Sequence, residues 1–232
     1  MLNKIKSVMI ANRGEISLRI IRACQELGVK SVAIYSEADK NTLPVKLADS
    51  TVCIGPAPAQ ASYQNQEAII SAALAFGVDA IHPGYGFLSE KADFAKKCED
   101  NGIIFIGPSA EIISKMGDKI EARKIAASAS VPTIPGSDGA VSEFKKALEI
   151  AESIGFPLLI KASAGGGGRG MRVVESRDTL EQDLNEIMSE AEVAFGDSSV
   201  YIEKYLTDIR HIEVQLLADG DSCIHLGERD CT

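Results

Sequence analysis

The residues with the clearest chemical potential in this sequence are a lysine and a run of four glycines. Lys161 follows the apolar residues 158–160, and Gly165 to Gly168 come shortly after it. Backbone without Cβ atoms lets N–H groups approach an anion closely, and the lysine adds a positive charge beside them. The pattern predicts a mobile glycine flap, built as a hairpin, that covers the phosphates of a nucleotide.

Two other interpretations of the glycine run agree less well with its flanks. A flexible linker is usually longer and bordered by polar residues, whereas strand-like apolar residues lie on both sides here, at 157–160 and 171–174. A Walker A loop would continue with Gly-Lys-Ser or Gly-Lys-Thr, and neither follows. A glycine hairpin between two strands is therefore the favoured interpretation.

A second candidate site is the segment 82–90, which reads HPGYGFLSE. It lies between an expected strand at 79–82 and an expected helix at 89–100, whose N-terminus would offer N–H donors to an anion. Ser89 stands where the dinucleotide-binding pattern requires its third glycine, so a dinucleotide site is not favoured. A tight turn with Ser89 as the helix N-cap is the structural alternative, and both interpretations can hold together.

Four further residues carry little information when taken singly. Lys119 lies just inside an expected helix start, Glu203 and Lys204 follow an expected strand, and His211 lies on another strand beside Arg210. Such residues are commonly an exposed lysine, a weak surface ion pair and a structural histidine. Only their order along the chain gives them weight.

The first half of the sequence alternates between strand and helix patterns, which predicts an α/β fold with a doubly wound parallel sheet. Gly28 and Gly77 stand where helix C-caps belong. Ligands of such sheets bind beyond the carboxyl ends of the strands, which draws attention to the loops after Ala11 and His82. The expected strands are 7–11, 31–35, 51–54, 79–82 and 103–106, and the expected helices are 16–27, 67–76 and 89–100.

The second half begins after a Pro/Gly-rich boundary at residues 131–136. The expected elements there are two helices before the boundary, at 111–116 and 119–130, then a helix at 142–154, a strand ending at 161, a strand at 171–175, a helix at 179–194, a strand at 200–202 and a hairpin turning at 219–220. We expect the acidic residues of the helix at 179–194 to form a face exposed to solvent, and they are Glu181, Asp183, Glu186, Glu190 and Glu192.

Composition narrows the possible classes of protein. The 232 residues are 45% hydrophobic and 25% charged, as in ordinary globular proteins, and the net charge of −9 argues against a nucleic-acid partner. The five cysteines show no CxxC spacing, so we expect buried free thiols in a reducing cytoplasm rather than disulfides or zinc. No segment is long enough to suggest a membrane span.

The order of the motifs resembles biotin carboxylase, an ATP-grasp enzyme that serves acetyl-CoA carboxylase and related carboxylases. The matching segments cover essentially the whole chain. They are IANRGEI at 10–16, HPGYGFLSE at 82–90, MGDK at 116–119, IKAS at 160–163, the glycine run through 172, EKYL at 203–206 and ERDC at 228–231.

The resemblance implies a division of the chain into four parts. These are an N-terminal α/β domain of the doubly wound type at 1–117, a helical linker at 118–135, an ATP-grasp lid subdomain with the glycine flap at 136–206, and the start of a truncated ATP-grasp core at 207–232.

The resemblance also implies the roles of individual residues. Two lysines would contact ATP phosphates, flap amides would cover them, a hinge segment would bind adenine through its backbone, and a histidine would line the nucleotide pocket. These residues are, in that order, Lys119 and Lys161, then Gly167 and Gly168, then Glu203, Lys204, Tyr205 and Leu206, and finally His211. Tyr85 and Gly86 would form a wall of the bicarbonate and biotin pocket. Ala164 replaces a glycine found in some members, with little expected effect.

The implied reaction has two stages. Bicarbonate attacks the γ-phosphorus of ATP to give carboxyphosphate and ADP, and the carboxyl group then passes to N1 of biotin on a biotin carboxyl carrier protein. The resemblance further implies magnesium, carboxyltransferase subunits as partners and a homodimer. Its magnesium ligands would lie beyond Thr232, so we expect this chain alone to be inactive.

Three alternatives stay open at this point. The chain could be an ATP-grasp ligase of the carbamoyl-phosphate-forming type, although the segment at 82–90 favours biotin carboxylase. It could be a non-catalytic nucleotide-binding fragment. It could also be the start of a multidomain carboxylase of the pyruvate or propionyl-CoA type.

Overall fold

The computed structural model describes residues 5–163 and 170–232 of the chain. These form two compact units, Met1–Ile125 and Ala126–Thr232. The division falls inside helix α6 (Lys119–Ser128) and therefore within the segment 118–135, for which the sequence predicts a helical linker.

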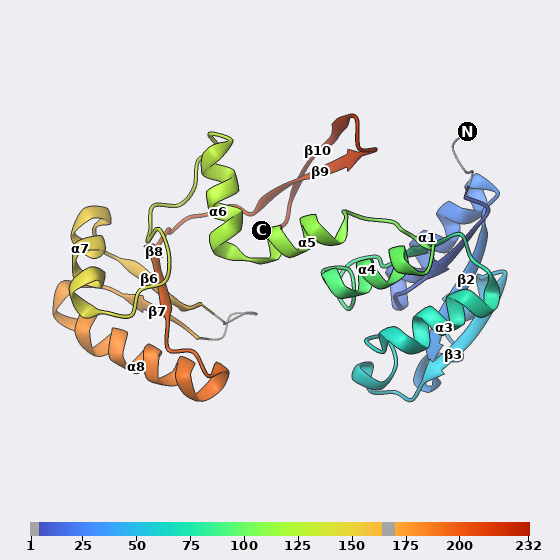
Figure 1. The fold of residues 1–232 in the computed structure, drawn as a ribbon, viewed down its shortest axis with the longest axis horizontal. Coiled ribbons are helices and arrows are strands. Elements are labelled where there is room, and N and C mark those ends of the chain that lie inside the picture. The colour runs from blue at the N-terminus through green and yellow to red at the C-terminus, as the bar shows by residue number, and fades with distance from the viewer. Residues whose placement is uncertain (1–4, 164–169) are drawn as a thin grey trace. The chain divides into compact units, whose positions relative to one another are not determined.

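The first unit contains a five-stranded parallel sheet, shown in blue to green in Figure 1. Its strand order is β3-β2-β1-β4-β5. The chain therefore adds β2 and β3 on one side of β1 and then returns to add β4 and β5 on the other side. This confirms the predicted doubly wound sheet and places its switch point between β1 and β4. The strands are β1 (Ser7–Ile10), β2 (Lys30–Ser36), β3 (Ser50–Gly55), β4 (Ala80–His82) and β5 (Ile104–Phe105).

Helices cover both faces of this sheet, because successive residues of the buried strands point to opposite sides. Met9 packs with residues of α3 and α4 on one face, whereas Val8 and Ile10 pack with residues of α1 on the other. The helices are α1 (Gly14–Leu27), α2 (Leu43–Leu47), α3 (Gln66–Phe76), α4 (Ala92–Asp100) and α5 (Ala110–Gly117), with short 3-10 turns η1 (Glu37–Asp39) and η2 (Ala59–Ala61).

The helix ends agree with the sequence at two places and differ at a third. Gly28 and Gly77 adopt the left-handed conformation as C-caps of α1 and α3, with φ of 67° and 60°. The helix expected from residue 89 begins instead at Ala92, with Lys91 as its N-cap. Ser89 is not the cap because the first helical hydrogen bond runs from the N–H of Ala95 to the carbonyl of Lys91, at 3.1 Å, and Ser89 lies in a turn before it.

The second unit contains a three-stranded antiparallel sheet of order β7-β6-β8. Two helices cover one face, and the core between them contains Ile160, Ile202, Leu184 and Ala147. The elements are α7 (Phe144–Ile154), β6 (Leu158–Ala162), β7 (Met171–Val174), α8 (Arg177–Phe195) and β8 (Val200–Lys204). The pairing of β6 with β7 confirms the predicted hairpin around the glycine run, and the carbonyl of Gly170 accepts from the N–H of Ala162 at 2.8 Å.

A separate hairpin follows, formed by β9 (Ile212–Ala218) and β10 (Cys223–Asp230). Its turn contains Asp219 and Gly220, as the sequence predicts, and Asp219 accepts hydrogen bonds from the N–H groups of Asp221 and Ser222. Within the described ranges, no helix is both long and apolar enough to cross a membrane.

Two expectations about side chains need correction. The acidic face of α8 is not simply solvated, because Arg172 of β7 forms ion pairs with Asp183, Glu186 and Glu190 of this helix. All five cysteines are free, but only two of them, Cys24 and Cys98, are buried. Sequence periodicity does not show that Arg172 faces α8. Arg172 does so because it pairs with Ile160, whose side chain points into the core beneath the helices.

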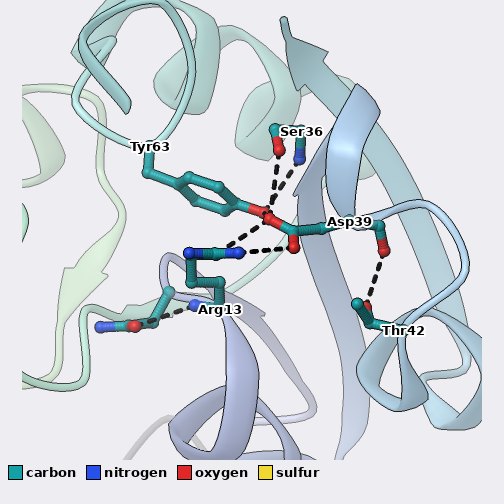
Figure 2. Close-up of polar contacts among 6 residues, drawn as sticks. Arg13, Ser36, Asp39, Thr42 and Tyr63 are labelled. Atoms are coloured by element: carbon teal, nitrogen blue, oxygen red, sulfur yellow. Dashed lines mark hydrogen bonds and ion pairs between the residues drawn. The ribbon is translucent and has the colours of Figure 1, made fainter. Parts of the chain in front are cut away.

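A polar cluster joins three loops at the carboxyl edge of the parallel sheet, and Figure 2 shows its side chains converging on one carboxylate. Asp39 accepts two hydrogen bonds from the guanidinium of Arg13, at 2.9 and 2.7 Å. It also accepts from the hydroxyls of Tyr63, at 2.7 Å, and Ser36, at 3.1 Å. Asp39 is buried, and the hydrogen bonds from Arg13 and then from Tyr63 and Ser36 hold its pKa below the usual range. The backbone carbonyl of Asp39 accepts from Thr42.

We expect Asp39→Asn to lower the free energy of unfolding near neutral pH by about 2 kcal/mol, because Arg13 and Tyr63 lose a charged acceptor. The pKa of Asp39 is lower in the folded chain than in the unfolded chain. Its contribution is therefore complete above the unfolded pKa of about 3.9 and is lost as pH falls through the folded pKa. Urea unfolding across acidic and neutral pH would measure this difference.

Glu37→Gln is the matched control, since Glu37 is an exposed carboxylate on the same turn. An equal loss in both variants would contradict the expected role of Asp39. So would a difference between Asp39→Asn and the unaltered chain that stays constant as the pH falls below the folded pKa.

Candidate functional site

The first candidate region lies at the switch point of the parallel sheet. Strands β1 and β4 are neighbours there, with Ile10 opposite His82, so the loops that follow them meet. The side-chain amide of Asn12, which is buried, donates to the carbonyls of Pro83 and Tyr85, each at 2.8 Å. Asn12 thus holds the backbone of the second loop. Sequence reasoning assigned it no role, although an asparagine directly after a switch-point strand was the available signal.

The loop after β4 has the conformation that its glycines allow. Gly84 has φ of 65°, and a Cβ atom there would lie 2.6 Å from Cγ2 of Ile16 and 2.7 Å from Nδ2 of Asn12. A side chain at this position would therefore displace the hydrogen-bonded amide of Asn12. Gly86 has φ of 69°, and Tyr85 between the two glycines is 63% exposed, with its hydroxyl 3.3 Å from Glu15 Oε1.

Phe87 continues this loop in a strained conformation. Its φ of 44° is unusual for a residue with a side chain and costs about 1–2 kcal/mol. Its ring stacks on that of Tyr63, with centroids 5.3 Å apart and planes at 22°. Such a stack contributes about 0.5–1.5 kcal/mol, which is comparable to the strain. Beside this loop, burial lowers the pKa of His82, whose Nδ1 accepts a hydrogen bond from the N–H of Gly84 at 3.0 Å.

The second candidate region is the face of the β7-β6-β8 sheet that α7 and α8 do not cover. Lys161 lies there, opposite Tyr201 in the pairing of β6 with β8. Its ammonium forms an ion pair with Glu203, the next residue of β8 on the same face. The side chains are 24% and 8% exposed, so the two charges are largely withdrawn from water. The pair lies where β6 leads into residues 164–169, and Gly167 and Gly168 are outside the described residues.

Lys204 points to the other side of β8 and has a different environment. Its ammonium donates to the carbonyls of Gly155, at 3.1 Å, and Phe156, at 2.7 Å. The N–H of Tyr205 donates to the carbonyl of Pro157 at 3.1 Å. The alternative that Glu203 and Lys204 form a surface ion pair is therefore wrong, because neighbouring residues of a strand face opposite sides. Together these contacts tie the segment 203–206 to the loop before β6, while the side chain of Leu206 stays exposed.

The remaining predicted site residues are less well defined by the structure. Lys119 begins α6, and its side chain is outside the described part of the structure. His211 is exposed at the start of the β9–β10 hairpin, where its backbone bonds to Thr232 and Cys231. Among the described residues, no group of three or more His, Cys, Asp or Glu side chains is placed to hold a metal ion. The structure brings Lys161 and Glu203 together in one unit and places Tyr85 and Gly86 in the other.

Comparison with protein families accounts for both units. Residues 4–113 match the family model described as the biotin carboxylase N-terminal domain. Residues 118–232 match the model described as the ATP-binding domain of the carbamoyl-phosphate synthase L chain. The second model is named for a carbamoyl-phosphate-forming enzyme, but the first favours biotin carboxylase, in agreement with the segment at 82–90.

Individual relatives give the same result. The biotin carboxylase of Haemophilus influenzae is 56% identical over 230 residues, which are 98% of this chain and 51% of that protein. The crystal structure of a biotin carboxylase–β,γ-ATP complex from Campylobacter jejuni superimposes with a TM-score of 0.89 at 52% identity, covering 98% of this chain and 51% of that one.

A third relative is the biotin carboxylase domain of a 2-oxoglutarate carboxylase from Hydrogenobacter thermophilus, a dimer in complex with MgADP, ADP and bicarbonate. It has a TM-score of 0.86 at 48% identity, with 98% of this chain and 50% of that one covered. The chain therefore belongs to the biotin carboxylase family, and it spans about half the length of the curated relatives that it matches.

Proposed function

We propose that this chain supplies the nucleotide-binding lid, and one wall of the bicarbonate and biotin pocket, of an enzyme that carboxylates biotin with ATP and bicarbonate. The observation that carries the proposal is the position of Lys161. Its ammonium lies on the face of the lid sheet opposite α7 and α8, paired with Glu203, near the end of β6. A cation held beside a glycine-rich sequence suits a polyphosphate ligand.

The proposed reaction joins two transfers. An oxygen of bicarbonate attacks the γ-phosphorus of ATP, and ADP leaves with the electrons of the broken P–O bond. The resulting carboxyphosphate then transfers its carboxyl group to N1 of biotin, and phosphate leaves with the electrons of the broken C–O bond and takes up the proton that N1 loses. Phosphoryl transfer depends mainly on positioning and on charge neutralisation rather than on covalent help from the protein.

The residues of this chain are proposed to do that positioning. Lys161 and Lys119 neutralise phosphate oxygens, and the amides of Gly167 and Gly168 cover them. The backbone of residues 203–206 binds adenine, held in place by the contacts of Lys204 and Tyr205 with the loop before β6. His211 belongs to the same pocket. The described residues offer no set of magnesium ligands, so no step is assigned to a metal-binding residue here.

The carboxylate of Glu203 also affects how Lys161 would bind a polyphosphate. While Lys161 is paired with Glu203, the net charge of the pair is zero. A polyphosphate that approaches Lys161 competes with this carboxylate for the ammonium protons. Charge-assisted hydrogen bonds to phosphate are strong enough to compete, because both partners are ionised. We therefore propose that Glu203 holds Lys161 in position until the nucleotide binds.

On the side of the parallel sheet, Tyr85 and Gly86 are proposed to line the pocket for bicarbonate and biotin. Asn12 holds the backbone of this loop through the carbonyls of Pro83 and Tyr85, and the ring of Tyr85 is exposed. An asparagine amide that binds two carbonyls fixes the loop backbone without adding a charge to the pocket. This suits a pocket that must admit a bicarbonate anion and the neutral ring system of biotin.

The proposed setting is the first half-reaction of acetyl-CoA carboxylase in fatty acid synthesis, in the cytoplasm, with MgATP as the nucleotide. The partners would be a biotin carboxyl carrier protein and carboxyltransferase subunits, and the enzyme would be a homodimer. The relation to biotin carboxylase of Haemophilus influenzae supports this setting. The similarity to a domain of 2-oxoglutarate carboxylase supports a second setting, a carboxylase that acts on a different acceptor.

We expect Lys161→Met to weaken binding of MgATP to this chain by about 10- to 100-fold, because a charge-assisted hydrogen bond to phosphate contributes about 1.5–3 kcal/mol. Isothermal calorimetry measures the affinity. Lys145→Met, at an exposed position of α7, is the control and should leave it within about twofold. Unaltered affinity of Lys161→Met would contradict the role of Lys161.

Because Lys161→Met leaves the buried carboxylate of Glu203 without its partner, loss of stability must be separated from loss of binding. Lys161→Met combined with Glu203→Gln removes the unpaired charge. We expect this double variant to regain thermal stability relative to Lys161→Met but not the affinity for MgATP. Recovery of affinity together with stability would show that the single variant acted through folding.

The overall reaction can be tested after joining this chain to the remaining half of the Haemophilus influenzae enzyme. We expect ADP release that requires both bicarbonate and biotin, and Lys161→Met should reduce kcat/KM for ATP by about 100-fold or more, as loss of one electrostatic contact in a transition state commonly does. Lys145→Met is again the control. ADP release that is independent of bicarbonate would refute biotin carboxylation by this route.

A further inference from the structure

The loop that carries Tyr85 and Gly86 is held at two points, and only one of them is explained by Asn12. Asn12 binds the carbonyls of Pro83 and Tyr85. Beyond Gly86, the loop depends on Phe87, whose ring lies on Tyr63. Phe87 keeps a positive φ of 44°, a conformation that persists in residues with side chains only where surrounding contacts enforce it.

Tyr63 is itself fixed more firmly than stacking alone requires. It is 2% exposed, and its hydroxyl donates to Asp39 at 2.7 Å and accepts from the N–H of Ser36 at 2.9 Å. Asp39 in turn is bound by Arg13, whose guanidinium carbon lies 5.8 Å from the centre of the Tyr63 ring. Figure 2 shows the Tyr63 hydroxyl and the Arg13 guanidinium meeting at this carboxylate.

These contacts form a continuous chain from the sheet to the loop. Ser36 ends β2, Asp39 lies in η1 and Arg13 directly precedes α1, so three segments of the sheet edge fix the hydroxyl end of Tyr63. The ring of Tyr63 then supports Phe87, the neighbour of Gly86. A shift of the Tyr63 ring would remove the support for the positive φ of Phe87, and the backbone next to Gly86 would relax with it.

We propose that Tyr63 is a positioning residue that sets the conformation of Tyr85 and Gly86 through its stack on Phe87, with Asp39 and Arg13 fixing its ring. The functional part of this inference rests on the proposed function, in which Tyr85 and Gly86 line the bicarbonate and biotin pocket. Tyr63 does not touch substrate in this arrangement. Its effect reaches the pocket only through the loop.

Hydrogen exchange of the Ser89 amide in this chain tests the conformational part, because that N–H donates to the carbonyl of Gly86 at 2.9 Å. We expect Tyr63→Leu to make this amide exchange about fivefold faster, as loss of one aromatic stack would. Tyr63→Phe keeps the ring and loses only the hydroxyl, so its effect should be smaller. The amides of β1 serve as the reference for global stability.

Two further variants make the result specific. Phe87→Leu removes the same stack from the loop side and serves if Tyr63→Leu does not fold. Phe105→Leu removes a different aromatic pair, Phe94 with Phe105, and should leave Ser89 unchanged relative to the amides of β1. If Ser89 and β1 exchange faster in parallel in Tyr63→Leu, or if Phe87→Leu leaves Ser89 unaffected, the proposal is overturned.

Titration of the chain with bicarbonate, followed by the NMR shifts of the Tyr85 and Gly86 amides, tests the functional part separately. We expect saturable shifts that require several-fold more bicarbonate in Tyr63→Leu and an intermediate amount in Tyr63→Phe. If the unaltered chain shows no shift while Ser89 exchange responds to Tyr63→Leu, the pocket assignment fails and the conformational role stands. If bicarbonate binds equally to all variants, the link from Tyr63 to the pocket is overturned.

Discussion

The interaction on which the candidate nucleotide site depends is the ion pair between Lys161 and Glu203. Both charges lie on a sheet face and are largely withdrawn from water, where a single unpaired charge would be costly. Each residue therefore requires the other as its partner. This constraint explains why the side chain of Lys161 keeps one orientation near the end of β6 instead of extending into solvent. The register of β6 and β8 provides it, by placing the two residues on one face two positions apart.

Both units hold their candidate functional segments in the same physical way. A buried or half-buried polar side chain binds two backbone carbonyls of a loop that is distant in sequence. Asn12 does so for the loop after β4, and Lys204 does so for the loop before β6. Such contacts satisfy carbonyl groups that a buried loop would otherwise leave unpaired. They place the neighbouring residues accurately without adding to the chemistry of the site.

The sequence predicted the fold well where local signals determine it. Strand and helix alternation indicated the doubly wound sheet, and Gly28 and Gly77 marked helix ends, because a left-handed C-cap depends on one residue. The start of α4 was missed because residues 86–91 form turns, with the N–H of Ser89 bonded to the carbonyl of Gly86 and that of Lys91 to the carbonyl of Leu88, before the helix begins. The short α2 and the two 3-10 turns gave no periodic signal long enough to detect.

Sequence motifs could identify residues of the candidate site, but they could not show which residues contact one another. Lys161 could be singled out because a lysine before a glycine run is a local pattern, whereas its pairing with Glu203 depends on strand register. Tyr63 and Asp39 gave no signal, because they are 24 residues apart and their hydrogen bond depends on the pairing of β2 with β3. A residue that acts by supporting another residue has no motif of its own. Its role follows from the chain of contacts, which is why the inference about Tyr63 required the folded structure.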